Sequence, residues 1–360
     1  MHLAKMPSGR WLATVRHEGR RRSISGSTRA DAQHAGAELL LEMGATPRAS
    51  NVTVAELVEG WFVASDLSNT YRVDARRVVD RLPPEFTARR LADVTPSVIE
   101  GLYRQLKREG WSVHRIGRAH AVLSSAWTLA RRYEWAVVNP FSAAKRPVAR
   151  RAPIDPPTQA QVAQLIAAAD ERFTLYLAVS SMFGARRGEV VALQWGDITD
   201  DAIIVRRSLN YAPGYGVSVT DGKIGEKGHR VLANDPQLAS WLREHRVDQV
   251  ELALRAGLPS PNWIFSHDAG VTPWRPDFAT REFARLRTTC ELPNTVKMKN
   301  LRHYVATQLL AAGSPLYVVG KRLGHRQLST TSDTYGSFAP AADQAATAVM
   351  AGIRDANAVS

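Results

Sequence analysis

The sequence predicts a multidomain protein that is mainly α-helical and carries small β-sheets. Its 360 residues exceed the length of about 250–300 residues at which a single hydrophobic core stops growing. Helix-capping patterns precede amphipathic runs along most of the chain, whereas β-rich runs are short and confined to two regions. A proline-rich basic segment, KRPVARRAPIDPP at residues 145–157, is the clearest interdomain linker.

Residues 1–48 read as a small unit of strands followed by a helix. Apolar and polar residues alternate over residues 11–16, and Glu18-Gly19 is a turn signal. A helix is expected from about Arg29 to Gly44, a glycine that suits a helix C-terminus. The basic strand edges of this unit fit a DNA groove, although so small a unit also fits a plain N-terminal appendage.

Residues 49–144 read as a helical domain with arginines and lysines on its polar faces. Four helices are expected, each with its own start or stop signal. The signals are the capping box of Thr53 and Glu56, Thr95-Pro96, Ser112 as the cap of a third helix, and a fourth run over residues 121–135 that Asn139-Pro140 ends.

Residues 158–360 read as a larger, mostly helical domain with a small sheet. Thr158 and Gln161 form a further capping box, and helices are expected up to about Met182. The strand candidates and the later helices follow in order: β-rich runs at 202–207, 215–220 and 230–232, then helices at 236–256 and from 276 onward.

Composition excludes several classes of protein. A single cysteine, Cys290, excludes an internal disulfide framework and a zinc site built from several cysteines. No apolar run reaches the roughly 18 residues that a membrane span needs, and no secretory signal pattern opens the chain. We therefore expect a cytoplasmic protein without a metal centre.

The positive charge is concentrated in the first part of the chain. The formal net charge is +13; residues 1–50 hold 8 Lys and Arg against 4 Asp and Glu, and residues 51–150 hold 16 against 10. The remaining residues hold 23 against 20. A basic part joined to a nearly balanced part favours a polyanion such as nucleic acid as the partner.

Four short segments carry residues suited to chemistry. They are the turn Gly184-Ala-Arg186-Arg187-Gly188-Glu189, Lys223 just after a predicted strand with Lys227 as its rival, Lys299-Asn-Leu-Arg302-His303 at a helix start, and Gly324-His325 followed by Tyr335. Residues 299 and 302 share one helix face, because they are three positions apart. Ser314 is expected to cap the next helix, Gly324 to end it, and Ser329 to cap the short helix that bears Tyr335.

Each segment alone has an ordinary structural reading, as a helix-terminal Arg, a solvated Lys, a cap His or a half-buried Tyr. Together, in this order and spacing, the segments resemble the tyrosine recombinase family of the phage integrase type. The resemblance covers the whole chain, is most specific over residues 301–335 and is least specific in the N-terminal unit. Two positions depart from the family pattern: Lys299 stands where His is usual, and Phe183 stands where Thr is common.

The resemblance implies an integrase that cleaves and rejoins DNA through a 3′-phosphotyrosyl intermediate. Tyr335 is then the nucleophile, Arg186 and Arg302 bind the phosphate, and Lys223 protonates the leaving 5′-oxygen. Lys299 supplies electrostatic help, His325 donates to a phosphate oxygen, and Glu189 and His303 support the site. Bond energy is conserved in the phosphotyrosyl link, so no cofactor is expected.

The family resemblance also implies domains and partners. Residues 1–48 would bind arm-type DNA sites, 49–144 core-type sites, and 158–360 would be the catalytic domain. The expected assembly is a homo-tetramer on double-stranded DNA, with a host DNA-bending protein and an excision factor as further candidate partners. Residues 340–352 suit docking on a neighbouring protomer or folding back on their own domain. Relaxation of DNA by a type IB topoisomerase mechanism, and bending of DNA without cleavage, are the alternative functions.

Overall fold

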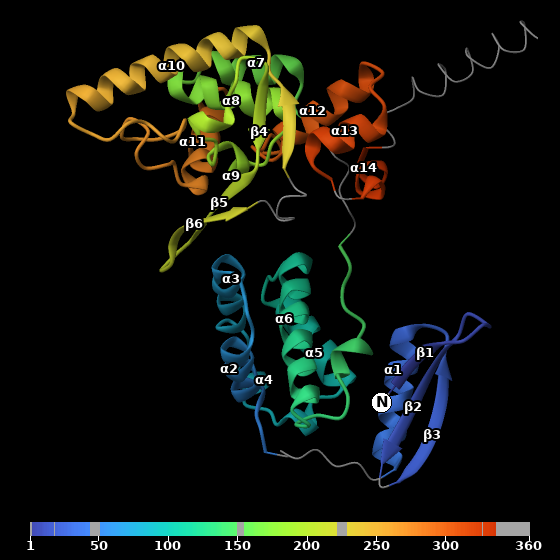
Figure 1. Ribbon diagram of the computed structural model, residues 1–360. Coiled ribbons are helices and arrows are strands. Elements are labelled where there is room, and N and C mark those ends of the chain that lie inside the picture. Colours follow the sequence, from blue (N-terminus) through green and yellow to red (C-terminus); the bar gives the residue numbers. More distant parts are fainter. Residues whose placement is uncertain are drawn as a thin grey trace, which may run out of the picture. The chain divides into compact units, whose positions relative to one another are not determined.

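The computed structural model describes residues 2–17, 19–43, 51–149, 155–221, 229–325 and 327–335. The chain divides into two compact units, residues 1–151 and 152–360, which are described separately below (Figure 1). Helices dominate both units and the sheets are small, as the sequence predicts. None of the described helices has the length and apolarity that crossing a membrane requires.

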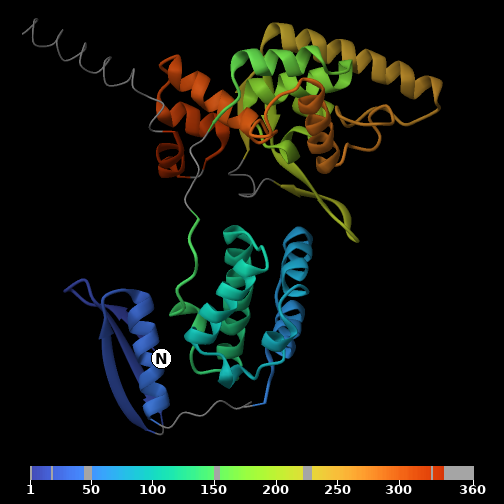
Figure 2. The same ribbon diagram turned by 180° about the vertical axis from the view of Figure 1, so that it is seen from behind.

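A three-stranded antiparallel sheet opens the first unit. Its strands are β1 (His2–Lys5), β2 (Trp11–His17) and β3 (Arg20–Gly26), in that spatial order. Helix α1 (Arg29–Glu42) packs along one face of this sheet, as Figures 1 and 2 show from opposite sides. The alternation at residues 11–16 is confirmed, since Ala13 and Val15 are fully buried. Strand β1 was not predicted.

The rest of the first unit is helical. Its elements are α2 (Val54–Ala64), α3 (Asn69–Val79), α4 (Pro84–Thr87), η1 (Leu91–Asp93), α5 (Pro96–Arg108), α6 (Val113–Arg132) and η2 (Pro140–Ser142). The capping box of Thr53 and Glu56 is present, and Thr95 caps α5 by accepting a hydrogen bond from the Val98 amide. Apolar residues of these helices form one core.

Two details of this helical part differ from the prediction. Ser112 caps one continuous helix, α6, and not a third helix followed by a fourth. No glycine or proline that would break a helix stands in the second half of this segment, and Gly117 is accommodated within the helix. Helix α3, capped by Ser68, was not predicted because its arginines obscure the apolar stripe that contains Ala75 and Val78.

The second unit is mostly helical with two separate two-stranded sheets. Its elements are α7 (Gln159–Ala167), α8 (Glu171–Phe183), α9 (Arg187–Val190), η3 (Trp195–Asp197), β4 (Ala202–Val205), β5 (Arg207–Ala212), β6 (Gly216–Asp221), β7 (Arg230–Ala233), α10 (Pro236–Arg255), α11 (Pro276–Thr289), α12 (Asn300–Ala311), α13 (Leu316–Leu323) and α14 (Leu328–Tyr335). Strand β4 pairs with β7, and β5 pairs with β6, both antiparallel. The main core includes Tyr176, Phe265 and Phe283.

A smaller core joins the last helices of this unit. Ala306 and Leu310 of α12, Val319 and Leu323 of α13 and Tyr335 of α14 pack together. The helix starts differ slightly from the prediction: Pro315, not Ser314, is the N-cap of α13, and Ser329 lies inside α14. Gly324 ends α13 in the left-handed conformation, as predicted.

Candidate active site

A glycine brings three distant segments into contact. Helix α8 ends at Gly184, which adopts a left-handed conformation with φ of 60°. A Cβ atom at this position would lie 2.7 Å from Leu323 Cδ2 and 3.2 Å from Val305 Cβ. Only a residue without a side chain lets the end of α8 approach α12 and α13 so closely. The contact brings together the turn after Gly184, the start of α12 before Val305, and the segment after Leu323.

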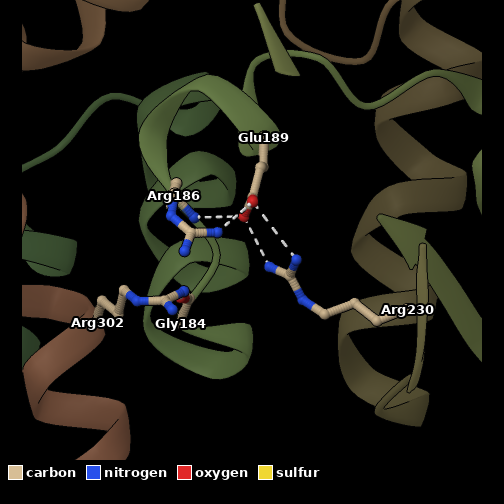
Figure 3. Close-up of polar contacts among 5 residues, drawn as sticks. All are labelled: Gly184, Arg186, Glu189, Arg230 and Arg302. Atoms are coloured by element: carbon tan, nitrogen blue, oxygen red, sulfur yellow. Dashed lines mark hydrogen bonds and ion pairs between the residues drawn. The ribbon is translucent and has the colours of Figure 1, made fainter. Parts of the chain in front are cut away.

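Glu189 holds two arginines at that point. Its Oε2 accepts a hydrogen bond from the Arg186 backbone amide at 2.8 Å, and its Oε1 pairs with Arg186 Nη1 at 2.8 Å. Arg230, from strand β7, donates through Nη2 to Oε2 at 2.6 Å and through Nη1 to Oε1 at 3.4 Å (Figure 3). Burial opposes ionisation of Glu189, but the contacts with Arg230 and Arg186 outweigh it and lower the pKa of the carboxyl to about 2.

A third arginine approaches from α12. Arg302 Nη1 donates to the carbonyl oxygen of Gly184 at 2.9 Å (Figure 3). Its Nη2 is buried and has no hydrogen-bond partner within the described part of the chain. Burial and the nearby Arg186 lower the pKa of Arg302 to about 10, so the guanidinium stays protonated at neutral pH. A buried, unsatisfied cationic donor of this kind suits an incoming anion.

Arg186, Lys299 and Arg302 share the wall of a pocket of about 580 Å³. Arg187, Arg287 and Lys297 add further positive charge to its lining, and Phe283 and Met298 give it an apolar part. Lys299 is the N-cap residue of α12 and is exposed, and the Arg186 side chain is 49% exposed. The shared pocket agrees with the predicted common face of residues 299 and 302.

His325 lies directly after α13, beside Arg230. A Cβ atom on Gly324 would lie 2.9 Å from Arg230 Nη1, so the glycine allows the chain to pass over this guanidinium. His325 Nδ1 is 2.7 Å from Thr331 Oγ1 in α14. Burial, with help from Arg302 and Arg186, lowers the pKa of His325 to about 4. The imidazole is therefore neutral at neutral pH and has one N–H to donate.

Tyr335 lies at the end of α14, inside this group. Its side chain is 1% exposed, and its hydroxyl is 2.6 Å from His303 Nδ1. The ring of His325 stacks on the Tyr335 ring with a centroid distance of 6.4 Å. Burial raises the pKa of Tyr335, while Arg302 acts in the opposite direction. The phenol is thus protonated and is surrounded by neutral imidazoles and a nearby cation.

The family model of the phage integrase family matches residues 158–340. The match covers more than half of the chain and includes every residue of the group described above. The chain belongs to the phage integrase family. The resemblance found in the sequence motifs is therefore confirmed.

Two named proteins have sequences similar to this phage integrase chain. The ICEBs1 integrase of Bacillus subtilis (strain 168) is 29% identical over 172 residues, which are 47% of this chain and 45% of that protein. A tyrosine recombinase XerC of Mesorhizobium japonicum is 27% identical over 252 residues, 67% of this chain and 74% of that protein. The chain thus matches less than half the length of the ICEBs1 integrase.

The structural similarity to a solved integrase extends over almost the whole chain. A lambda integrase, in a structure of its tetramer bound to a Holliday junction, is similar with a TM-score of 0.60 at 16% identity, over 91% of this chain and 94% of that one. This similarity confirms the expected fold class for the phage integrase chain.

The structure gathers most of the residues singled out in the sequence. Arg186, Glu189, Arg302, His303, His325 and Tyr335 lie together, and Lys299 lies at the pocket. Lys223, Lys227 and residues 340–352 lie outside the described residues. Arg230 was missed as a site residue, because its link to Glu189 spans 41 positions and no local pattern marks it. In the sequence, Arg230 is distinguished just by its position at the start of a short predicted strand after Lys223.

Proposed function

We propose that this phage integrase chain is a site-specific recombinase of a mobile element, which cleaves and rejoins DNA through a 3′-phosphotyrosyl intermediate. The observation that carries the proposal is the convergence of Arg186 and Arg302 near a buried tyrosine, with one Arg302 nitrogen lacking a partner among the described residues. A phosphodiester in the pocket would supply the missing acceptors. Guanidinium groups suit phosphate because their paired N–H donors match its oxygens.

The arrangement supports a division of roles. Arg186 and Arg302 would stabilise the additional negative charge of the pentavalent transition state, a type of contribution worth about 3–4 kcal/mol per donor. Glu189 and Arg230 would orient Arg186. Neutral His325, whose Nδ1 lies beside Thr331, would carry its single proton on Nε2 and donate this N–H to a phosphate oxygen. Lys299 would add positive charge at the pocket.

The covalent step conserves the phosphodiester energy. The Tyr335 oxygen would bond to phosphorus, and the bond from phosphorus to the 5′-oxygen would break. Lys223 is our proposed donor of the proton that the 5′-oxygen takes, with Lys227 as its alternative. A 5′-hydroxyl from the partner duplex would later attack the phosphotyrosine and release Tyr335. No cofactor enters this balance.

The domain organisation supports a DNA complex. We propose that residues 1–48 bind arm-type sites, residues 49–144 bind core-type sites, and 158–360 catalyse the reaction. The basic charge of the first 150 residues suits contact with the phosphate backbone. Four protomers on two duplexes are proposed, by analogy with the lambda integrase tetramer bound to a Holliday junction.

A nicked suicide duplex tests this function. It carries the attachment site with a nick just past the cleavage position, so the short 5′-hydroxyl fragment diffuses away and the protein stays attached to the 3′ end. We expect the wild type to give a covalent complex that denaturing electrophoresis detects. Tyr335→Phe should give none, whereas Tyr317→Phe, which changes an exposed tyrosine of α13, should react normally.

Four outcomes decide between the alternatives. Covalent attachment that persists in Tyr335→Phe would show that another residue is the nucleophile. With two intact sites, exchanged strands would support recombination. Relaxation of supercoiled DNA without exchange would instead indicate a topoisomerase-like activity, and bending without attachment would indicate a binding protein.

A further inference from the structure

Within the described part of the chain, the hydroxyl of Tyr335 hydrogen-bonds with one group, His303 Nδ1, at 2.6 Å. The two side chains come from different elements, since His303 lies in the first turn of α12 and Tyr335 ends α14. Their ring centroids are 5.5 Å apart. The contact lies next to Arg302, the residue that precedes His303 in α12.

The direction of this hydrogen bond follows from the buried surroundings. A phenol has one proton to donate, and a neutral imidazole has one nitrogen that accepts. Burial, with Lys299 and Arg302, lowers the pKa of His303, so the ring is neutral at neutral pH. Because Tyr335 is 1% exposed, its proton has no solvent partner. The tyrosine therefore donates to Nδ1, and the imidazole carries its own proton on Nε2.

The other charged and titratable groups facing His303 do not take this proton. Lys299 and Arg302, on the same helix, are cations without an acceptor at neutral pH. His325, after α13, is engaged through Nδ1 with Thr331, and its ring lies nearly parallel to the tyrosine ring with a centroid distance of 6.4 Å. His303 is thus the one described acceptor in direct contact with the phenol.

We propose that His303 is the general base that accepts the Tyr335 proton during DNA cleavage. This inference depends on the proposed function and adds the step which that function leaves open. As the bond between the tyrosine oxygen and phosphorus forms, the phenol proton moves to His303 Nδ1. The bond from phosphorus to the 5′-oxygen breaks, and this oxygen is protonated by the acid of the proposed mechanism. In rejoining, imidazolium returns the proton to the departing phenolate.

The bound phosphate assists this transfer. Its negative charge, placed between Arg302 and Tyr335, favours a positive imidazolium nearby and offsets the burial and the cations that oppose it. A positioned base of this kind contributes about 10²- to 10⁴-fold to a rate. Lys299, the N-cap residue of α12, carries only hydrogen-bond donors, so His303 is the acceptor at the start of this helix.

The test is single-turnover cleavage of the nicked suicide duplex over a pH series from about 5 to 8. His303→Gln retains a hydrogen-bond acceptor for the phenol but cannot take up a proton. We expect this variant to cleave about 10²-fold more slowly or worse at neutral pH, with DNA affinity within about twofold of the wild type. The wild-type rate should fall at low pH as His303 becomes protonated, and His303→Gln should lose this decline.

Two further variants separate catalysis from support of the fold. His303→Ala leaves a cavity beside Tyr335, and added imidazole should restore part of its cleavage rate. His245→Gln is the matched control, because His245 is a half-buried histidine of the same unit that bonds to the Ile264 carbonyl. We expect it to cleave like the wild type with an unchanged pH profile.

The outcomes are distinguishable from failure of the proposed function. If the wild type forms no covalent complex, the proposed function is wrong. If the wild type reacts and His303→Gln keeps its rate and its low-pH decline, the general-base role is wrong. If His303→Gln and His303→Ala are both slow, but imidazole does not help and the low-pH decline remains, His303 only supports the fold.

Discussion

Two carboxylates of the second unit are bound in almost the same way, yet their surroundings differ. Glu189 of α9 and Asp197 of η3 each accept a hydrogen bond from a backbone amide three residues earlier, at 2.8 Å and 3.0 Å. Each also binds two arginines. Asp197 pairs with Arg206 and Arg207, both at 2.7 Å, and its side chain is 2% exposed.

The difference lies in what the arginines connect. Arg206 and Arg207 are neighbours in the sequence, and their pairing with Asp197 joins η3 to the start of β5. Arg186 and Arg230 come from segments 44 positions apart. Arg302 lies so close to Arg186 that the positive charge of Arg186 adds to burial in lowering the pKa of Arg302. One arrangement closes a local turn, while the other assembles a positively charged site. A buried ion pair thus indicates a site only when uncompensated charge surrounds it.

Arg302→Ala should have the largest effect of the changes that probe this comparison. We expect suicide-substrate cleavage to fall by at least about 10²- to 10³-fold, because a preorganised donor to the transition state is lost. DNA affinity should change only a few-fold, since other cations contact the backbone. The control is Arg207→Ala, which should lower the melting temperature and leave cleavage near the wild-type rate. Equal losses of DNA affinity and cleavage in Arg302→Ala would make Arg302 a binding contact.

Glu189→Gln and Asp197→Asn form a matched pair. Each removes one buried charge that two arginines share, a change that costs about 3–5 kcal/mol of stability when a buried pair is broken. Glu189→Gln should additionally slow cleavage by about 10- to 100-fold in protein that remains folded, because Arg186 loses its orientation. Chemical denaturation and single-turnover cleavage measure the two effects. A similar loss of cleavage in Asp197→Asn would remove the distinction.

Gly324→Ala should have an intermediate effect. The new Cβ would lie 2.9 Å from Arg230 Nη1 in a backbone with φ of 70°, so the Arg230 guanidinium must shift, and this shift disturbs its pairing with Glu189. We expect a loss of stability of about 1–3 kcal/mol together with slower cleavage. Gly313→Ala shares the positive φ, at 82°, but has no atom within 4 Å, so it should lose stability without slowing cleavage. Equal cleavage rates in the two variants would argue against the role of Arg230.

The dependence of stability on pH is the smallest expected effect. The pKa of His325 is lowered in the folded state to about 4, so the unfolded chain binds a proton first as the pH falls from about 6.5. Folding stability should therefore decline between about pH 6.5 and 4, and His325→Gln should reduce this decline. Glu189, with a pKa of about 2, loses its contribution below about pH 4.5. Melting temperatures of the wild type and of His325→Gln, measured over a series of pH values, check both pH ranges.

The sequence predicted those parts of the fold that depend on neighbouring residues. The cap at Thr95, the capping box at Thr158 and the stop at Gly324 are all present, because each involves atoms within a few positions. The start of α12 and the turn before α9 were also predicted. Strand β5 was missed although it forms a local hairpin with β6, because its buried residues, Leu209 and Ala212, are three positions apart and do not alternate as in a typical half-buried strand.

The sequence predicted which residues belong to the candidate site better than it predicted which of them contact one another. The order of the motifs alone indicated that Arg186, Arg302, His325 and Tyr335 belong to one site. The pairing of Glu189 with Arg230 and the contact between His303 and Tyr335 depend on how distant segments pack, which no local spacing encodes.

The absence of a side chain at Gly184 has a consequence for making chimeric enzymes. The end of α8, Val305 and Leu323 meet at the point where a Gly184 side chain would lie. Arg302 donates a hydrogen bond to the carbonyl oxygen of the same glycine. A segment taken from another family member would carry different side chains into this contact and would not pack against the two segments that remain. Exchanges aimed at new DNA targets should therefore move these three segments as a set, or leave all of them in place.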